Sequence, residues 1–275
     1  MRPLILVTND DGIDSPGLLA AIAALYDLGD LIIVAPTTQQ SGMSRSLSAQ
    51  FDGRIFSLCL AYNGLQVDAF HLDGSPAQTV LYGVEEVAPR MAGRLPDLVV
   101  SGINYGENLG SQTMISGTVG AALQGGDMGI RSLAVSLETS MDYHMHHGED
   151  VDWSGAAYWL AWFARQALAP YAWPTDVAVL KIDVPEGSTP QTPWRLTSQS
   201  NQVYYRSILT RTGSLDEPER LDYAVVIDHE RLEPASDIHA FAVDRIVSVT
   251  PLSANLTARV SLPDFDVLLR QAAKG

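Results

Sequence analysis

A strand–helix–strand pattern at the beginning of the chain constrains the fold more than any other feature. Two short apolar runs, residues 3–7 and 31–35, flank a helix pattern over residues 17–28. Ser15 and Pro16 match the N-cap and the first position of that helix. Strands that are buried on both faces consist of continuous apolar runs, so this order predicts a β-α-β unit of a parallel sheet.

Apolar runs and helix patterns continue to alternate until about residue 138. An Asn63-Gly64 pair between apolar-rich runs is typical of a tight β-hairpin turn, and Ser75-Pro76 marks the start of a helix. The other predicted elements here are strands over residues 97–101 and 132–137 and helices over residues 76–87 and 119–128. Together they indicate an α/β fold with a mostly parallel sheet and helices on both faces.

The second half of the chain is less regular. Residues 204–210 and 223–228 flank a turn that contains Gly213, which predicts a projecting β-hairpin. The remaining predicted elements are helices over residues 151–168 and 262–273 and strands over residues 177–182 and 245–249. No internal repeat divides the chain. We therefore expect one domain over residues 1–275, with the core sheet and the site in residues 1–138 and the remaining core elements, the hairpin and a C-terminal helix in residues 139–275.

The charge balance excludes several classes of protein. The chain has 17 Lys and Arg against 32 Asp and Glu, a formal net charge of −15, and only two of the cations are lysines. Such a chain repels nucleic-acid backbones and anionic membrane surfaces. It also contains no G-x-x-x-x-G-K phosphate loop. Phosphate chemistry would therefore need a cation from outside the chain.

Several features point to a cytoplasmic protein. No apolar run is long enough to span a bilayer, and the first residues lack the pattern of a signal peptide. The single cysteine, Cys59, cannot form an intrachain disulfide, which fits a reducing compartment.

Three polar segments, residues 9–12, 40–42 and 102–106, follow predicted buried strands. In an open parallel sheet, ligands bind beyond the carboxyl ends of the strands. If these strands are neighbours, the three segments meet at one edge of the sheet.

Four oxygen-bearing residues of these segments are candidate metal ligands. Asp10 and Asp11 are adjacent acids, which repel each other unless one is protonated or a cation lies between them. Ser41 and Asn104 complete a set of hard oxygen ligands that suits Mg²⁺, Mn²⁺ or Ca²⁺ better than zinc. The alternative is that the two acids only cap and form the turn before Gly12.

A candidate anion site follows the glycine-rich loop predicted over residues 102–118. Ser116, Gly117 and Thr118 lead into a helix, so their N–H groups and hydroxyls lie at its positive end. The alternative is that Ser116 or Thr118 only caps that helix. A metal site beside an anion site favours hydrolysis of a phosphate ester.

The motifs resemble those of the SurE (survival protein E) family. Residues 5–17, Ile-Leu-Val-Thr-Asn-Asp-Asp-Gly-Ile-Asp-Ser-Pro-Gly, are similar to its N-terminal signature. Residues 35–42, 101–104, 116–119 and 246–252 are similar to its later motifs in order. Ile115 departs from the pattern, because an aromatic residue often precedes Ser-Gly-Thr.

The resemblance implies a Rossmann-like phosphatase that hydrolyses nucleoside 5′-monophosphates, and often 3′-monophosphates, with one divalent metal ion per subunit, Mg²⁺ or Mn²⁺. The implied metal ligands are Asp10, Asp11, Ser41 and Asn104, and the implied phosphate contacts are Asn108, Ser116, Gly117 and Thr118. It also implies a homodimer or homotetramer with an assembly hairpin over residues 203–226.

The expected mechanism is attack by a metal-activated water, with Asp10 or Asp11 accepting its proton. Phosphatases of the haloacid-dehalogenase type instead form an aspartyl-phosphate on a D-x-D motif, which Gly12 interrupts here. An exopolyphosphatase and a non-catalytic nucleotide or metal sensor remain alternatives.

Other polar residues are predicted to lie outside the site. His144, His146 and His147 are assigned to a solvated loop, with a lid over the substrate as the alternative. Asp237, His239 and Asp244 are predicted to lie on the surface.

Overall fold

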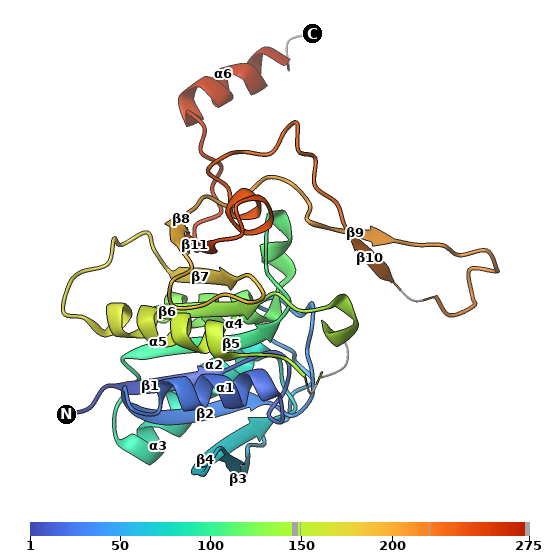
Figure 1. The fold of residues 1–275 in the computed structure, drawn as a ribbon. Helices are drawn as coiled ribbons and strands as arrows, with labels where there is room; N and C mark the ends of the chain where they lie inside the picture. Colours follow the sequence, from blue (N-terminus) through green and yellow to red (C-terminus); the bar gives the residue numbers. More distant parts are fainter. Residues whose placement is uncertain (145–147, 149, 220, 273–275) are drawn as a thin grey trace.

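A nine-stranded sheet runs through the molecule (Figure 1), in a computed structural model that describes residues 1–144, 148, 150–219 and 221–272. The strand order is β3-β4-β2-β1-β5-β6-β7-β11-β8. Neighbouring strands are parallel except in the pairs β3–β4 and β7–β11, which confirms a mostly parallel sheet. The strands span Leu4–Thr8 (β1), Asp30–Pro36 (β2), Phe56–Tyr62 (β3), Leu65–Leu72 (β4), Leu98–Tyr105 (β5), Ser132–Leu137 (β6), Val179–Val184 (β7), Trp194–Leu196 (β8) and Val247–Leu252 (β11).

Helices cover both faces of this sheet (Figure 1). On one face α1 (Pro16–Leu25) packs against α5 (Ser154–Leu168), and on the other α2 (Pro76–Tyr82) packs against α4 (Gly117–Asp127). Successive side chains of a strand point to opposite faces. Accordingly, Ile5 and Val7 of β1 join the apolar cluster beneath α1 and α5, whereas Leu4 and Leu6 join the cluster on the other face.

The helix that begins after Ser75 is longer than predicted. Ser75 and Gln78 form a capping box, as the sequence suggested for the start. Beyond α2 the chain continues through a π-helical turn, Gly83–Val87 (η1), into α3 (Ala88–Ala92). Pro89 lies in the first turn of α3, where its missing N–H is not needed, so it does not end the helix.

Strand β5 is also longer than predicted, and part of the expected glycine-rich loop is strand. Asn104 and Tyr105 still pair with Ser136 and Leu137 of β6, after an irregularity that follows Ser101. The prediction of a loop from residue 102 is therefore wrong for its first residues. Asn104 lies at the end of a strand, within the sheet edge that forms the site.

The C-terminal part projects from this body in two places (Figure 1). A small antiparallel sheet of β9 (Tyr205–Ile208) and β10 (Asp222–Val225) forms the predicted hairpin. Helix α6 (Leu262–Ala272) extends from the opposite end of the C-terminal segment and exposes apolar side chains, among them Phe265 and Leu268. Among the described residues, no helix combines the length and apolar character needed to cross a membrane. The remaining short helices are Ser111–Ile115 (η2), Met141–His144 (η3) and His239–Val243 (η4).

Candidate functional site

The three polar segments meet at one edge of the sheet, because β1 lies between β2 and β5 and all three strands are parallel. Asp11 and Thr118 do not line the cleft themselves, but each forms a hydrogen bond with a lining residue, Asp11 with Tyr105 and Thr118 with Asp10. Six of the eight predicted site residues line one cleft of about 170 Å³: Asp10, Ser41, Asn104, Asn108, Ser116 and Gly117.

Asp10 and Asp11 are buried side by side at the end of β1, with exposed fractions of 4% and 2%. Asp10 Oδ1 accepts a hydrogen bond from Thr118 Oγ1 at 2.6 Å, and Asp11 Oδ2 accepts one from the N–H of Tyr105 at 3.2 Å. Burial raises the pKa of Asp10 to about 6. Burial and then the charge of Asp10 raise the pKa of Asp11 well above its ordinary value. A cation between the two carboxyl groups would relieve both effects.

The other two predicted ligands present neutral oxygens. The amide nitrogen of Asn104 donates to the carbonyl groups of Tyr105 and Gly106, at 3.0 and 2.6 Å, which turns Asn104 Oδ1 away from them. Ser41 Oγ accepts from Gln39 Nε2 at 3.0 Å. Two carboxylates, a hydroxyl and an amide oxygen are a donor set that fits Mg²⁺ or Mn²⁺.

The N-terminus of α4 lies against one of these ligands, Asp10, and forms part of the cleft. Ser116 caps the helix, since its hydroxyl accepts from the N–H of Val119 at 3.1 Å. The hydroxyl of Thr118 is bonded to Asp10, so the structure does not show it free to contact phosphate, as the resemblance implied. A Cβ on Gly117 would lie 2.6 Å from Asp10 Oδ2. Only glycine therefore allows the helix end to lie this close to the carboxylate.

The outer wall of the cleft contains three residues that sequence reasoning missed, Glu107, Tyr205 and Tyr223. His144, for which a lid over the substrate was the alternative prediction, lines the same wall. Tyr205 Oη donates to Glu107 Oε1 at 2.7 Å, and the rings of His144 and Tyr205 meet edge to face with centroids 5.8 Å apart. Tyr205 and Tyr223 come from the hairpin, which the sequence suggested only as an assembly element.

The solvated-loop prediction is wrong for His144. Its imidazole is half-buried against Tyr205, and its carbonyl oxygen accepts from Gln39 Nε2 at 2.7 Å. Burial lowers the pKa of its imidazole. His146 and His147 lie outside the described residues.

The surface prediction is wrong for Asp237, which is fully buried. Its carboxylate pairs with the ammonium of Lys181 at 3.1 Å, and this partner explains why a charged side chain can lie in the interior. Asp244 is exposed and His239 is half-buried.

The buried carboxyl of Glu107 should make the free energy of unfolding depend on pH. Burial raises the pKa of its carboxyl from 4.5 to about 6. The folded protein thus holds this proton more tightly than the unfolded chain, so the free energy of unfolding falls as the pH rises from about 4.5 to about 6, by about 2 kcal/mol in total. Glu107→Gln should therefore raise Tm at about pH 8 and leave it nearly unchanged below about pH 4.5.

Thermal unfolding at the two pH values measures this difference. Glu85→Gln, a change at an exposed acid that does not line the cleft, is the control and should leave Tm unchanged at both pH values. An equal shift of Tm at both pH values for Glu107→Gln would show that the carboxyl proton is not the cause.

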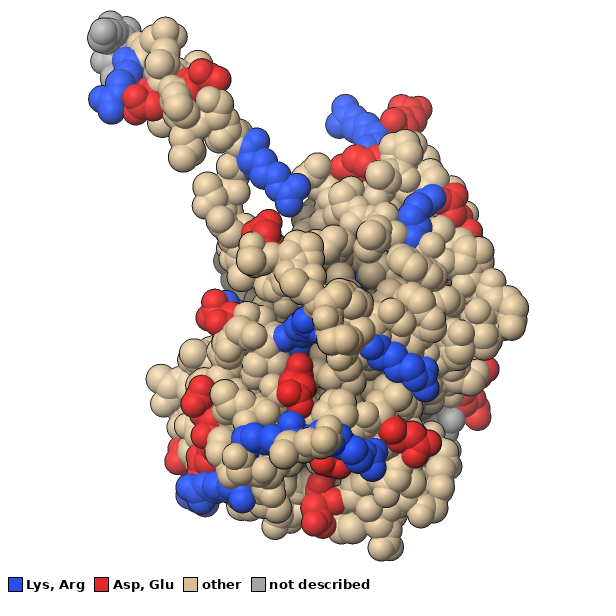
Figure 2. Space-filling model, turned by 90° about the vertical axis from the view of Figure 1, so that its left-hand side faces the viewer, with Lys and Arg blue, Asp and Glu red and all other residues tan. Residues whose placement is uncertain are grey.

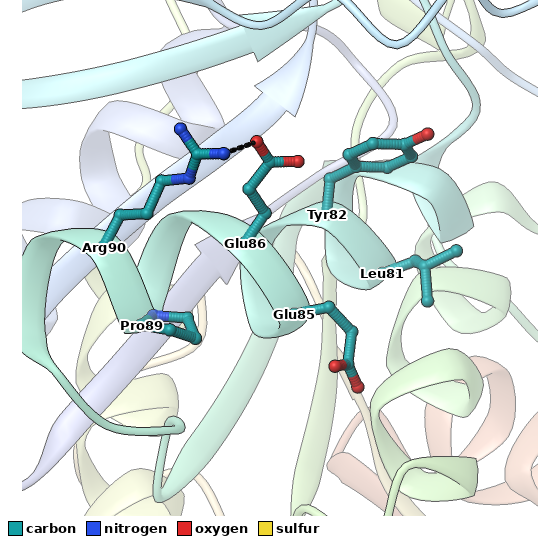
Figure 3. Close-up of a pocket in the computed structure, with 6 residues that line it drawn as sticks. All are labelled: Leu81, Tyr82, Glu85, Glu86, Pro89 and Arg90. Carbon is teal, nitrogen blue, oxygen red and sulfur yellow. Dashed lines mark ion pairs between the residues drawn. The ribbon is translucent and has the colours of Figure 1, made fainter.

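Three larger hollows lined by described residues do not combine adjacent buried carboxylates with a helix N-terminus. Figure 3 shows one of about 420 Å³ on α2, η1 and α3, lined by Leu81, Tyr82, Glu85, Glu86, Pro89 and Arg90. Its Glu86 is already paired with Arg90 at 2.8 Å. The adjacent buried carboxylates and the helix N-terminus are found together at the cleft beside β1.

Comparisons with known proteins agree with the geometry. The family model described as Survival protein SurE matches residues 5–206. A 5′-nucleotidase SurE of Thermococcus kodakarensis is 34% identical over 265 residues, which are 96% of this chain and 98% of the relative. A 5′-nucleotidase SurE of Archaeoglobus fulgidus is 37% identical over 267 residues, which are 96% of this chain and 95% of the relative. The chain belongs to the SurE family.

The fold agrees with that of a solved SurE structure. The crystal structure of SurE from Aquifex aeolicus matches with a TM-score of 0.73 and 27% identity, over 97% of this chain and 100% of the other. The resemblance seen in the sequence motifs is therefore confirmed. All eight predicted site residues of this SurE protein lie within the matched residues 5–206, whereas Asp237 lies beyond them.

Proposed function

We propose that this SurE protein is a phosphoric monoester hydrolase that releases phosphate from nucleoside 5′-monophosphates, and also from 3′-monophosphates. One observation carries the proposal: two adjacent buried carboxylates lie at the carboxyl edge of a parallel sheet, and one of them, Asp10, lies directly against the N-terminus of α4. This arrangement offers a place for a cation and, beside it, a place for an anion. The names of the relatives, 5′-nucleotidase SurE, support the same reaction.

Asp10, Asp11, Ser41 and Asn104 would hold one divalent metal ion per subunit, Mg²⁺ or Mn²⁺. Such an ion, when bound, supplies positive charge to a phosphate oxygen and lowers the pKa of water. Hydrogen bonds within the chain orient three of the proposed metal ligands. Thr118 orients Asp10, the N–H of Tyr105 orients Asp11, and two carbonyl groups orient Asn104.

The phosphate would lie in the cleft, beside these ligands and the first turn of α4. The N–H of Gly117 has no partner within the helix, because the first turn leaves such groups free. With the side chains of Asn108 and Ser116 it would stabilise charge on the equatorial oxygens. Thr118 would act mainly through Asp10.

Water would attack phosphorus in line with the leaving oxygen. A carboxylate oxygen of Asp10 or Asp11 would accept the proton of that water. The nucleoside oxygen then leaves and takes up a proton. Direct attack by an aspartate would instead produce a phosphorylated Asp10 or Asp11.

The substrate would be a small anion and not polymeric nucleic acid or a membrane. On the face shown in Figure 2, basic and acidic side chains are interspersed among other residues, and no broad basic surface gathers there. Binding a polyanion requires many simultaneous cationic contacts. A mononucleotide requires only the one cleft.

We also propose assembly into a homodimer or homotetramer. The support is the exposure of Leu262, Phe265, Leu268 and Leu269 on a helix that projects from the body (Figure 1). Apolar side chains concentrated on such an element are typical of a surface that another copy covers.

Purified protein with Mn²⁺ should release phosphate from AMP, and EDTA should abolish the release, because the described residues that line the cleft include no Lys or Arg. Phosphate release is measured with AMP, 3′-AMP and short polyphosphate at equal concentration. Release mainly from polyphosphate would favour an exopolyphosphatase, and binding of AMP without release would favour a sensor. A phosphorylated aspartate in the quenched reaction would contradict attack by water.

A further inference from the structure

A cluster of three ionic side chains lies buried behind the cleft, and the proposed reaction does not use it directly. Lys181 and Asp183 of β7 and Asp237 are all fully buried. Lys181 Nζ lies 2.5 Å from Asp183 Oδ2 and 3.1 Å from Asp237 Oδ2. Replacing buried ionic clusters with apolar side chains often leaves stability unchanged or higher. Stability alone is therefore a weak explanation for these charges.

Both carboxylates bind the main chain of the loop that follows β5. Asp183 Oδ1 accepts from the N–H of Asn108 at 2.7 Å, and Asp237 Oδ2 accepts from the N–H of Gly110 at 3.1 Å. Two main-chain N–H groups of the loop, those of Asn108 and Gly110, thus donate to buried carboxyl groups. Asn108 is among the residues that line the cleft, and its amide nitrogen donates to the buried Ser136 Oγ at 2.9 Å.

Lys181 opposes the effect of burial on Asp183, because burial raises the pKa of that carboxyl and the adjacent ammonium lowers it. Burial by itself lowers the pKa of the Lys181 ammonium, but the adjacent carboxylates of Asp183 and Asp237 outweigh burial and hold that pKa above its ordinary value. Hydrogen bonds to an ionised acceptor are about twice as strong as those between neutral groups. The cluster therefore holds the loop more firmly than neutral side chains would.

The same cluster reaches the segment that leads into the hairpin. Asp237 Oδ1 accepts from the N–H of Ser200 at 2.9 Å. Next to it, the N–H of Ser111 donates to the carbonyl of Gln202 at 2.9 Å. Asp237 and this main-chain bond thus connect the loop beside the cleft to the segment that leads into β9.

We infer that Lys181, Asp183 and Asp237 are positioning residues for phosphate recognition: they hold the main chain from Asn108 to Gly110 where the Asn108 side chain meets the phosphate. This inference rests on the proposed function, in which Asn108 contacts that phosphate. None of the three touches the substrate, so their effect acts through Asn108 and not through the metal ligands.

Asp183→Ala tests the inference, because it removes the acceptor of the Asn108 N–H. We expect KM for AMP and the inhibition constant of inorganic phosphate to rise about tenfold, since a hydrogen bond to a charged group has that effect when it is lost. The Mn²⁺ concentration for half-maximal activity should stay within about twofold. Asp183→Asn preserves the volume, and its single carbonyl oxygen can serve Asn108 or Lys181 but not both, so we expect about a threefold rise.

Glu233→Ala is the matched control. Glu233 accepts from Ser200 Oγ at 2.7 Å and from the N–H of Asn201 at 3.2 Å, so it holds the neighbouring segment but not the loop of Asn108. It should lower Tm without changing the inhibition constant of phosphate. If Asp183→Ala does not fold, Asp183→Asn carries the test.

Two results would overturn the inference. One is a lower Tm for the Asp183 variants while KM for AMP and the inhibition constant of inorganic phosphate stay unchanged, which is what a purely structural role produces. The other is an equal rise in the Mn²⁺ requirement. The increase of Tm caused by inorganic phosphate with Mn²⁺ gives the same comparison without turnover. Inactivity of the wild type toward AMP would therefore contradict the proposed function while leaving the positioning role testable.

Discussion

Asp11→Asn should reduce hydrolysis of AMP by at least about a hundredfold, because a loss of about 3 kcal/mol of transition-state stabilisation lowers a rate by two powers of ten. Asp11 is one of only two anionic donors in the proposed metal site. Asparagine has the same shape, and its carbonyl oxygen can still accept from the N–H of Tyr105. The fold should therefore survive the change, and the rate of phosphate release from AMP with Mn²⁺ is the measurement.

The same variant should change stability in opposite directions with and without metal. Without metal, the substitution removes a buried carboxyl whose pKa is raised by burial and by Asp10, so Tm should increase. With Mn²⁺, the wild type should gain stability from binding and the variant should gain little. Asp14→Asn, at an exposed acid of the same turn, is the control and should do neither. Wild-type activity of Asp11→Asn with Mn²⁺ would show that the ligand assignment is wrong.

Features set by neighbouring residues could be predicted from the sequence. The bounds of β6 agree with the prediction, and the hairpin between β3 and β4 has its turn at Asn63 and Gly64, both with positive φ. Buried strands and tight turns depend on local patterns, so they are visible without coordinates. The meeting of the three polar segments followed from one topological condition, that β1, β2 and β5 are neighbours.

Features set by contacts between distant residues could not be predicted. Tyr205 bonds to Glu107 across 98 residues of sequence, and Lys181 pairs with Asp237 across 56. A charged residue is buried when a partner compensates it, and no local pattern identifies that partner. This is why Asp237 was assigned to the surface and why Glu107 was overlooked.

The acidic composition takes on a physical meaning in the folded chain. A net charge of −15 with two lysines by itself disfavours the binding of a phosphate anion. One of those lysines, Lys181, is buried as the counterion of Asp183 and Asp237 and is not available to a ligand. The cleft instead combines two carboxylates with a helix N-terminus, which is why the proposed function assigns the cation that meets the phosphate to these carboxylates.

Gly117→Ala should reduce AMP hydrolysis by about a hundredfold, since a misplacement of about 1 Å at a reacting centre has an effect of that size. The added Cβ would lie 2.6 Å from Asp10 Oδ2 and 2.7 Å from Asp10 Cβ. Both distances are shorter than real carbon contacts, so either the carboxylate or the first turn of α4 must move. The proposed metal ligand and the proposed phosphate donor would then no longer be aligned.

Gly126→Ala separates this effect from a general loss of stability. Gly126 lies near the other end of α4, and a Cβ there would lie 2.6 Å from the carbonyl oxygen of Ala178, a comparable clash far from the cleft. It should lower Tm and leave kcat and the inhibition constant of inorganic phosphate near their wild-type values. Gly117→Ala should change both constants and also the Mn²⁺ requirement, because its clash is with Asp10. If the two variants lost activity only in proportion to Tm, the close approach of α4 to Asp10 would be a packing feature without a role in the reaction.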